Sequence, residues 1–404
     1  MRISTNQFYQ SGLNNILDQQ SNLNITQDKI STGLKVTKPS DDPVATITII
    51  NLEQEIALTE RYNKNADIAT ANLSVEEATL QKVIETLQRV RELILSGGNA
   101  TYGNVERNSL AVEMEELLGQ VVGLANFKNA AGDYMFSGHS INVTPFTQDA
   151  TGAYTYNGDQ GIRNAQISTS TQIAMNDSGY RVFQNIFNGN GDFVTTADPT
   201  NTGTGVISIG SVVDRGAYVE DTYTVDIVDL GGGVLGYDVS DSGGAPVITG
   251  APYVDGGDIS FNGMSFDISG TPAIGDTFTV SPSTRQDLFT TIQNTVATLQ
   301  SNVVTEADSA LMKNELQNAL ENIDQAMQNV GSIQAEVGTR LNVAENQNLI
   351  NTDFILTSKI TLSKVRDLDI AEAITDLNIR KISLEAAQAS FVRIQNLSLF
   401  NFIS

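Results

Sequence analysis

The sequence contains no cysteine, no tryptophan and one histidine, His139, and only 6% of its 404 residues are aromatic. Without cysteine, thiol chemistry and a disulfide framework are both excluded. A Ser-His-Asp triad or a histidine-ligated metal site would have to use His139, which lies in a Ser-Gly-His-Ser segment with no nucleophile motif nearby. We therefore expect an exposed turn histidine. The sequence predicts no catalytic residue, no cofactor site and no metal site, and hence a protein that is not an enzyme.

Basic side chains are also scarce. The chain has 23 Lys and Arg against 47 Asp and Glu, a net charge of -24. This balance argues against nucleic acid as a partner, because phosphate binding requires clustered basic residues. The longest apolar run, residues 44 to 52, is too short to cross a bilayer, and residues 1 to 15 lack the apolar core of a secretory signal. We expect no membrane insertion and, if the chain is exported, a signal-independent route.

Two glycine-rich segments imitate ligand-binding motifs. Residues 231 to 236 formally fit a dinucleotide glycine pattern, but they join two β-like runs, so no helix amino terminus is available for a pyrophosphate. Residues 188 to 192 contain Asn, Gly and Asp but lack the terminal Glu of a calcium loop. We predict a hairpin loop for the first segment and a turn for the second.

Seven-residue spacing is the strongest pattern that is present. Tyr9, Ile16, Leu23 and Ile30 follow it near the amino terminus, which predicts a narrow coiled-coil seam that needs partner helices. Gly33 tolerates the positive φ that ends a helix. Asp41, Asp42 and Pro43 then predict a new helix start, with Asp as cap and Pro at the first position. The sequence therefore predicts two helices joined by an elbow, whose defining residues are Gly33, Asp41, Asp42 and Pro43.

Further helices flank a different kind of segment. Leu73, Leu80, Leu87 and Ile94 keep the seven-residue spacing within residues 44 to 95, which predicts a long helix with a packing stripe. This segment and residues 104 to about 131 predict an antiparallel helical hairpin. Toward the carboxyl end, seven-residue spacing from residue 320 to 362 predicts one helix of roughly 50 residues. The spacing then shifts to Ile370, Leu377, Leu384 and Phe391, which predicts a kink near residues 366 to 369. We expect the apolar surfaces of Leu384 and Phe391 to be covered only when subunits meet.

Strand and turn patterns occupy residues 138 to 284, including an Asn262-Gly263 hairpin turn. Residues 186 to 284 contain thirteen acidic side chains and one basic side chain, Arg215, so an exposed outer surface is expected. The predicted fold is α+β: a long antiparallel helical bundle or coiled coil formed by both termini, with an inserted antiparallel β-rich domain. The predicted divisions are listed here: terminal assembly helices 1–40 and 366–404, helical bundle 41–137 and 285–365, and outer β-domain 138–284.

Five local sequences carry a family resemblance. Residues 1 to 5, the Ser31-Thr32-Gly33 stop and the restart from Pro39 to Pro43 resemble the amino terminus of the flagellin superfamily. Pro43 favours the hook-filament junction proteins of that superfamily over filament flagellins, which usually continue with small residues there. The aromatic-Ser-Gly exit at residues 134 to 138 and the apolar ending at 397 to 403 also resemble the junction proteins.

The resemblance implies a structural subunit that joins the flagellar hook to the filament and polymerises through its terminal helices. The implied partners are copies of itself in a ring, the first hook-associated protein (FlgK type), flagellin and an export chaperone (FlgN type). It also implies secretion through the flagellar type III apparatus to the extracellular flagellum. The residues expected to mediate assembly are Tyr9, Ile16, Leu23, Ile30, Ile370, Leu377, Leu384, Phe391, Leu399 and Phe400.

Two alternatives stay open at this point. The first is a filament flagellin, which shares the Gly-Leu and Asp-Asp pairs near the elbow. The second belongs to another class: an adhesin-like binding module that carries the β-domain on a coiled-coil stalk. We favour the junction subunit over the adhesin, because an adhesin should have an ordinary signal peptide or anchor.

Overall fold

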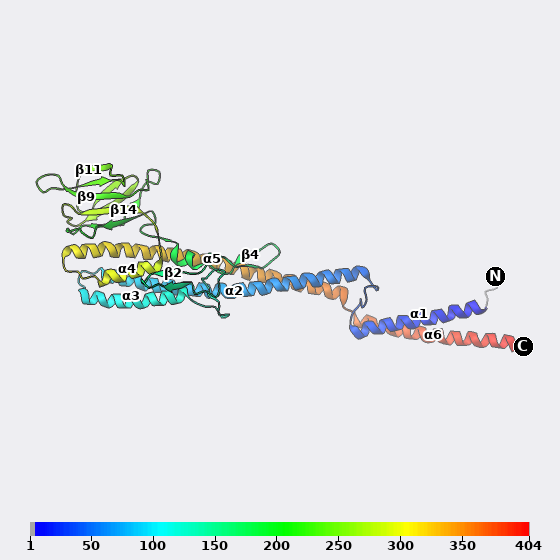
Figure 1. The fold of residues 1–404 in the computed structure, drawn as a ribbon. Helices are drawn as coiled ribbons and strands as arrows, with labels where there is room; N and C mark the ends of the chain where they lie inside the picture. Colours follow the sequence, from blue (N-terminus) through cyan, green and yellow to red (C-terminus); the bar gives the residue numbers. More distant parts are fainter. Residues whose placement is uncertain (1–4, 404) are drawn as a thin grey trace. The chain divides into compact units, whose positions relative to one another are not determined.

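A computed structural model describes the backbone of residues 5–403 and the side chains of that range except those of residues 5, 6, 8 and 394–403. The chain forms two compact units (Figure 1). We call Met1–Asn65 with Asn346–Ser404 the terminal unit, and Ala66–Glu345 the central unit. Long helices pass through both units, so the boundary falls within continuous helices.

Helices dominate both ends of the described chain, which confirms the predicted α+β class. They are α1 (Thr5–Thr32), α2 (Pro43–Gly97), α3 (Asn104–Ala125), α4 (Leu288–Gln300), α5 (Glu306–Arg366) and α6 (Ile370–Ile403). The predicted break near residues 366 to 369 is confirmed, and α5 is longer than expected, at 61 residues. The expected end of α3 near residue 131 is wrong. Asn126 ends it, because its side-chain amide makes two 2.9 Å hydrogen bonds with the backbone of Phe146.

The core of the central bundle follows the predicted spacing on α2. Leu73, Leu80 and Leu87 are fully buried there. An aromatic cluster lies beside them: the ring centroid of Phe183 is 5.3 Å from that of Phe136 and 5.6 Å from that of Phe146. Phe136 therefore packs at the helix exit, as expected for a large aromatic side chain.

The strands form two groups that differ in what they pack against. The first group consists of β1 (Phe146–Gln148), β2 (Tyr154–Tyr156), β3 (Asn164–Gln166), β4 (Gln172–Ala174) and β5 (Ile186–Phe187), with a π-helix, η1 (Tyr180–Gln184), before β5. Phe146, Ile173 and Phe183 of this group belong to the bundle core. The sequence placed the start of the β-rich insertion at residue 138, whereas the structure joins residues 146–186 to the bundle core.

The second group builds a separate β-domain. Its strands are β6 (Phe193–Ala197), β7 (Val206–Ile207), β8 (Ser211–Val212), β9 (Tyr223–Asp229), β10 (Leu235–Ser240), β11 (Pro246–Pro252), β12 (Gly257–Phe261), β13 (Met264–Ser269) and β14 (Thr277–Pro282), and β15 (Arg285–Gln286) follows them. One antiparallel sheet has the order β11-β10-β9-β14-β6, and the other has β12-β13-β7 with β8 also on β13. Residues such as Phe193, Val225 and Phe278 form its own core.

The predicted turns of the β-domain are confirmed. Asn262 (φ 45°) and Gly263 (φ 76°) connect β12 to β13, and both need the positive φ typical of two-residue hairpin turns. Gly231, Gly232 and Gly233 all have positive φ and connect β9 to β10 as a hairpin loop. In the 188–192 turn, the Asn190 side-chain oxygen accepts backbone N–H bonds from residues 192 and 193.

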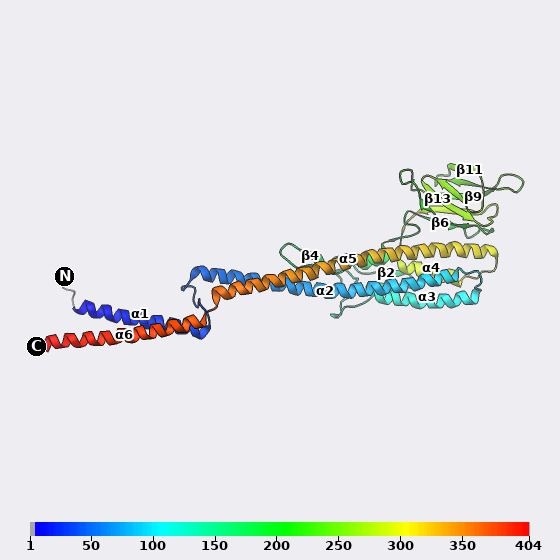
Figure 2. The ribbon, with the colours of Figure 1, turned by 180° about the vertical axis from the view of Figure 1, so that it is seen from behind.

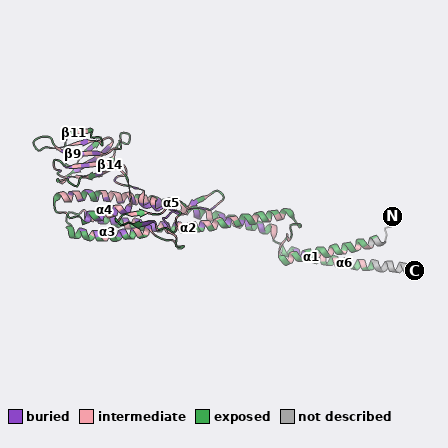
Figure 3. Cartoon of the chain, in the orientation of Figure 1, coloured by how far each residue is buried: buried purple, intermediate pink, exposed green. Residues whose placement is uncertain are grey.

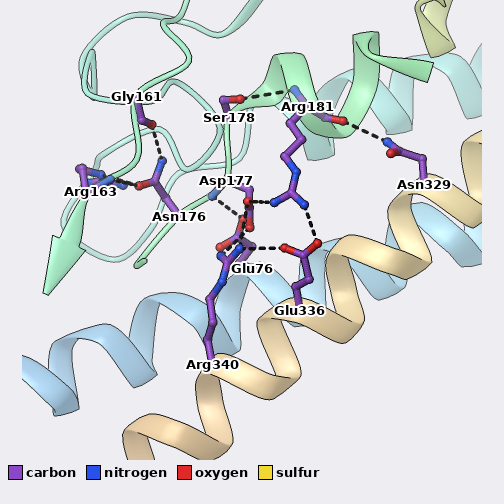
Figure 4. Close-up of polar contacts among 10 residues, drawn as sticks. All are labelled: Glu76, Gly161, Arg163, Asn176, Asp177, Ser178, Arg181, Asn329, Glu336 and Arg340. Carbon is purple, nitrogen blue, oxygen red and sulfur yellow. Dashed lines mark hydrogen bonds and ion pairs between the residues drawn. The ribbon is translucent and has the colours of Figure 1, made fainter. Parts of the chain in front are cut away.

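A buried charge cluster ties α2, α5 and the segment before η1 together (Figure 4). The Asp177 carboxylate is fully buried and accepts hydrogen bonds from Arg181 and Arg340, each at 2.7 Å. The Asp177 backbone N–H donates to Glu76 Oε1 at 3.0 Å. Burial, and secondarily the Asp177 charge, raises the pKa of Glu76 to about 8. Glu76 is therefore a protonated carboxyl at neutral pH.

Candidate assembly site

The terminal helices α1 and α6 lie side by side in the terminal unit (Figure 2). Tyr9, Ile16, Leu23 and Ile30 are each half-buried, as are Leu377, Leu384 and Phe391 on α6. The two predicted seams thus contact one another within one chain. Long-range polar contacts accompany them: the Thr26 hydroxyl donates to Asp376 at 3.3 Å, across 350 residues of sequence.

Phe391 shows how close this pairing is. Its ring centroid lies 5.7 Å from that of Tyr9, with the two rings almost perpendicular. A Cβ added to Gly12 would lie 2.9 Å from the Phe391 ring, so only glycine fits without a shift at this contact. We expected Leu384 and Phe391 to be covered only by other subunits. The structure instead half-buries both in the same chain.

One of the predicted assembly residues is not part of this contact, and two others cannot be placed. Ile370 is 55% exposed at the start of α6, and Ala373, one turn later, is buried at 7% exposure. Position 370 precedes the face of α6 that α1 covers. The side chains of Leu399 and Phe400 lie outside the described residues.

A second set of apolar side chains in the terminal unit is exposed, and sequence analysis did not single it out. On α1 and α6, the exposed fractions run from 44% for Ile25 to 65% for Ile382. Figure 3 shows exposed residues along both helices. We give the name exposed apolar face to all of these side chains together, on several stripes of four helices: Leu13, Leu17 and Ile25 of α1, Val44, Ile47 and Ile50 of α2, Leu349, Ile350, Phe354, Leu356 and Ile360 of α5, and Ile374, Ile379, Ile382 and Val392 of α6. The sequence does contain a signal for this set, because apolar residues lie on more than one stripe of the same helix.

The elbow joins the turn after α1 to the break between α5 and α6. Gly33 ends α1 with φ 69°, as predicted. The Lys35 N–H donates to the Arg366 carbonyl at 2.7 Å, and the Leu368 N–H donates to the Gly33 carbonyl at 2.9 Å. These bonds close a short antiparallel bridge, so the α1 turn and the α5–α6 break hold each other.

Two neighbouring aspartates organise the restart of the chain into α2. Asp42 Oδ1 accepts the backbone N–H bonds of Val44 (3.1 Å) and Ala45 (2.9 Å), which is the predicted cap, and Pro43 is the first helical residue. The Asp41 carboxylate accepts from the Thr37 hydroxyl at 2.9 Å and from the Lys38 N–H at 3.1 Å. These bonds, that of Thr37 first, lower the pKa of Asp41. Asp41 therefore orders the loop while Asp42 starts the helix.

Charge is divided unevenly between the two units. The terminal unit contains 12 Lys and Arg and 13 Asp and Glu, whereas the central unit contains 11 and 34. The terminal unit thus carries a net charge of -1, and the central unit carries -23 of the total of -24. Copies of the terminal unit can approach without strong repulsion, whereas copies of the central unit repel one another.

The single histidine lies on the surface of the protein. His139 is exposed, as predicted, and its backbone N–H donates to Asp159 at 2.9 Å. Within residues 5–403, leaving aside the undescribed side chains, no group of three or more His, Asp or Glu is arranged to hold a metal ion. No helix in the described part of the chain is long and apolar enough to cross a membrane.

Comparison with known proteins identifies relatives of this chain. Residues 3–140 match the model of the bacterial flagellin N-terminal helical region, and residues 320–403 match that of the C-terminal helical region. Hook-associated protein 3 of Salmonella typhimurium is 32% identical over 186 residues, 46% of this chain and 58% of that protein. Its counterpart in Escherichia coli is 24% identical over 400 residues, 99% of both chains. The crystal structure of hook-associated protein 3 from Legionella pneumophila is 34% identical with a TM-score of 0.76, covering 78% of this chain and 98% of that one.

Flagellin-type helical regions at both ends, paired through α1 and α6 and separated by a β-domain, define a structural protein of the bacterial flagellum. The resemblance predicted from the sequence is confirmed. The chain belongs to the hook-associated protein 3 (FlgL) family of the flagellin superfamily.

Proposed function

We propose that the chain is the subunit that joins the flagellar hook to the filament, and that the terminal unit is its assembly surface. The observation that carries the proposal is the exposed apolar face on a unit with almost no net charge. Full burial of one large aliphatic side chain contributes roughly 1.5 to 3 kcal/mol. Because many such side chains stay exposed in the single chain, packing of neighbouring copies has a large driving force.

The seams, the exposed apolar face and the central unit have different roles in this proposal. The seam residues Tyr9, Leu23, Leu384 and Phe391 hold α1 to α6, so that the pair is presented as one element. The exposed apolar face then contacts neighbouring subunits. The acidic central unit stays outside the contact region, because like charges at that density repel.

Family membership also supports proposals about the particular partners of the chain. We infer that copies form a ring between the first hook-associated protein (FlgK type) and flagellin. A cytoplasmic chaperone (FlgN type) would cover the apolar carboxyl-terminal helix before export through the flagellar type III apparatus. We infer that the chain has no enzymatic role, since its relatives are structural proteins of the flagellum. The match of both termini to flagellin regions favours this function over the adhesin-like alternative.

The test uses single substitutions on the exposed apolar face. Leu17 and Ile382 are 54% and 65% exposed, so Leu17→Asp and Ile382→Asp should leave the melting temperature of the purified monomer within about 2 °C. The same changes should abolish assembly, because contact between subunits would bury an unpaired carboxylate. In cells that lack the native gene, we expect hooks without filaments and flagellin shed into the medium.

Asn14→Asp is the matched control, since Asn14 is an exposed polar residue of α1 and the change adds the same charge without removing an apolar side chain. Cells with this control should bear filaments. Normal filaments on cells with Leu17→Asp and Ile382→Asp would contradict the proposed surface.

A further inference from the structure

The side of α5 that meets the β-domain is lined by amides. Asn314, Asn318 and Asn322 are spaced four residues apart, which places them on one face of the helix. The buried Asn314 side chain donates to the Gly205 carbonyl at 3.2 Å and accepts from the Ile207 N–H at 2.8 Å. These three residues, which we call the amide row, bond to the backbone of the β-domain.

The other two members of the row make one bond each, with opposite polarity. Asn318 donates through Nδ2 to the Thr195 carbonyl at 2.7 Å. Asn322 accepts through Oδ1 from the Gly189 N–H at 2.7 Å. Because every partner is a backbone group, the row recognises the path of the β-domain chain rather than its side chains.

Apolar packing does little to hold the β-domain in this position. The bundle core and the β-domain core have no residue in common. A cavity of about 590 Å³ lies between them, lined largely by amides and hydroxyls that include Asn294, Thr298, Asn318 and Asn322. Among the described residues, no ion pair joins residues 188–284 to a helix. The amide row is therefore the principal directional contact beyond the connecting chain.

That connection is narrow. β5 and β15 pair with each other where the chain enters and leaves the β-domain. Asn188 adds three bonds to Thr284. Its N–H donates to the Thr284 carbonyl at 3.0 Å, its Oδ1 accepts the Thr284 N–H at 2.7 Å, and its Nδ2 donates to the Thr284 hydroxyl at 3.3 Å. This paired two-strand neck is the covalent attachment of the β-domain to the bundle.

Electrostatic repulsion opposes the docked arrangement. Residues 188–284 contain thirteen acidic residues and one arginine, a net charge of -12. The remainder of the central unit contains 21 acidic and 10 basic residues, a net charge of -11. Two bodies of like charge repel over a screening length of about 30 Å at 0.01 M salt, which falls to about 10 Å at 0.1 M.

We propose that the amide row is a docking clasp. The β-domain exchanges as a rigid body between a docked and an undocked position, and the clasp favours the docked one against the repulsion. The docked population increases with ionic strength. This inference is independent of the assembly function, and it gives the outer domain an adjustable orientation without any unfolding.

The experiment compares two isosteric changes, Asn318→Asp and Asn322→Asp. Both add one negative charge to the same face of α5, one turn apart. Only Asn318→Asp loses its bond, because a carboxylate cannot donate to the Thr195 carbonyl, whereas a carboxylate at position 322 can still accept the Gly189 N–H. Since the chain has no cysteine, Ala245→Cys in the β-domain and Ser109→Cys on α3 allow specific spin labelling of both residues. The readout is the distance distribution at 10 mM and 500 mM NaCl.

For the labelled wild type and Asn322→Asp, we expect a broad distribution at 10 mM that narrows at 500 mM. The distance distribution of Asn318→Asp should stay broad at both salt concentrations, with an undocked population about fivefold or more larger than that of the wild type. Equal distributions for the two variants would show that added charge, not the donor, governs docking. A wild-type distance distribution that is the same at both salt concentrations would show that the β-domain has a fixed position. Either outcome overturns the proposal. If Asn318→Asp does not fold, as judged by circular dichroism, Asn318→Ala removes the same donor without a charge.

Discussion

At the scale of single residues, Glu76 shows how burial changes chemistry. Its side chain is completely buried between α2 and the segment at Asp177, and its Oε2 has no hydrogen-bond partner among the described residues. An ionised carboxylate there would lie near the buried charge of Asp177. Burial therefore favours the protonated form, which explains the pKa of about 8.

This pKa predicts a pH-dependent stability. The folded state holds a proton on Glu76 that the unfolded chain releases above the ordinary value of 4.5. The stabilisation that comes from this bound proton is fully present below about pH 4.5. Between pH 4.5 and about 8 the free energy of unfolding decreases by about 1.4 kcal/mol for each pH unit, and above pH 8 it no longer changes for this reason. Glu76→Gln is permanently neutral. We expect its stability relative to wild type to increase from pH 5 to pH 8.

Urea unfolding at several pH values would measure this difference. Glu85→Gln, at an exposed position of the same helix, serves as the control and should give a curve parallel to that of wild type. Parallel curves for Glu76→Gln and wild type would show that Glu76 is already ionised in the folded protein.

At the scale of elements, the helix ends that meet at the elbow depend on local features that a short sequence can specify. Asp42 caps α2, Asp369 caps α6 by accepting from the N–H groups of Ala371 (2.9 Å) and Glu372 (3.1 Å), and Gly33 ends α1. None of the three requires a distant residue for its effect. Together they set where each helix begins or ends, and thus how the seams are presented.

Asp42→Ala should loosen the first turn of α2. Loss of the side-chain acceptor costs about 1 kcal/mol, so hydrogen exchange at the amides of Val44 and Ala45 should accelerate by roughly fivefold. Asp42→Asn keeps an acceptor of similar capping strength and should exchange like wild type. Exchange that is unchanged in Asp42→Ala would mean that Pro43 and the bridge to Arg366 already fix the turn.

At the scale of the whole molecule, the β-domain is an insertion whose ends meet. β5 and β15 pair through Ile186–Phe187 and Arg285–Gln286, directly beside the bundle. Removal of the β-domain alone leaves the bundle core intact. Removal of residues from 145 onward would also delete Phe146 and Phe183, which belong to that core.

A short Gly-Ser linker in place of residues 188–284 should therefore leave filaments attached to hooks and a folded bundle. Replacement of residues 145–280 should instead unfold it, because two fully buried aromatic side chains are lost, at about 3 to 5 kcal/mol each. Melting curves and filament counts measure the two effects. Loss of filaments in the shorter deletion, with the protein folded and exported, would show that the β-domain makes contacts that the junction needs.

The sequence alone determined the features that depend on nearby residues. The Gly33 stop, the Asp42-Pro43 restart and the Asn262-Gly263 turn each follow from backbone preferences over a few positions. Seven-residue spacing of apolar side chains predicted the long helices, and the local sequences near the elbow indicated the family. Spacing also located the buried stripe of α2 at Leu73, because one helix face can be read without its partner.

Only the tertiary structure decided which distant segments meet. Thr26 contacts Asp376, Glu76 contacts Asp177, and Asn318 contacts Thr195, all across more than a hundred residues. Periodicity identifies an apolar or polar face but not the element that covers it, since many pairings bury the same stripe equally well. For the same reason, the sequence could not divide residues 138–284 between two cores, or distinguish the seam that pairs α1 with α6 from the apolar face that stays exposed.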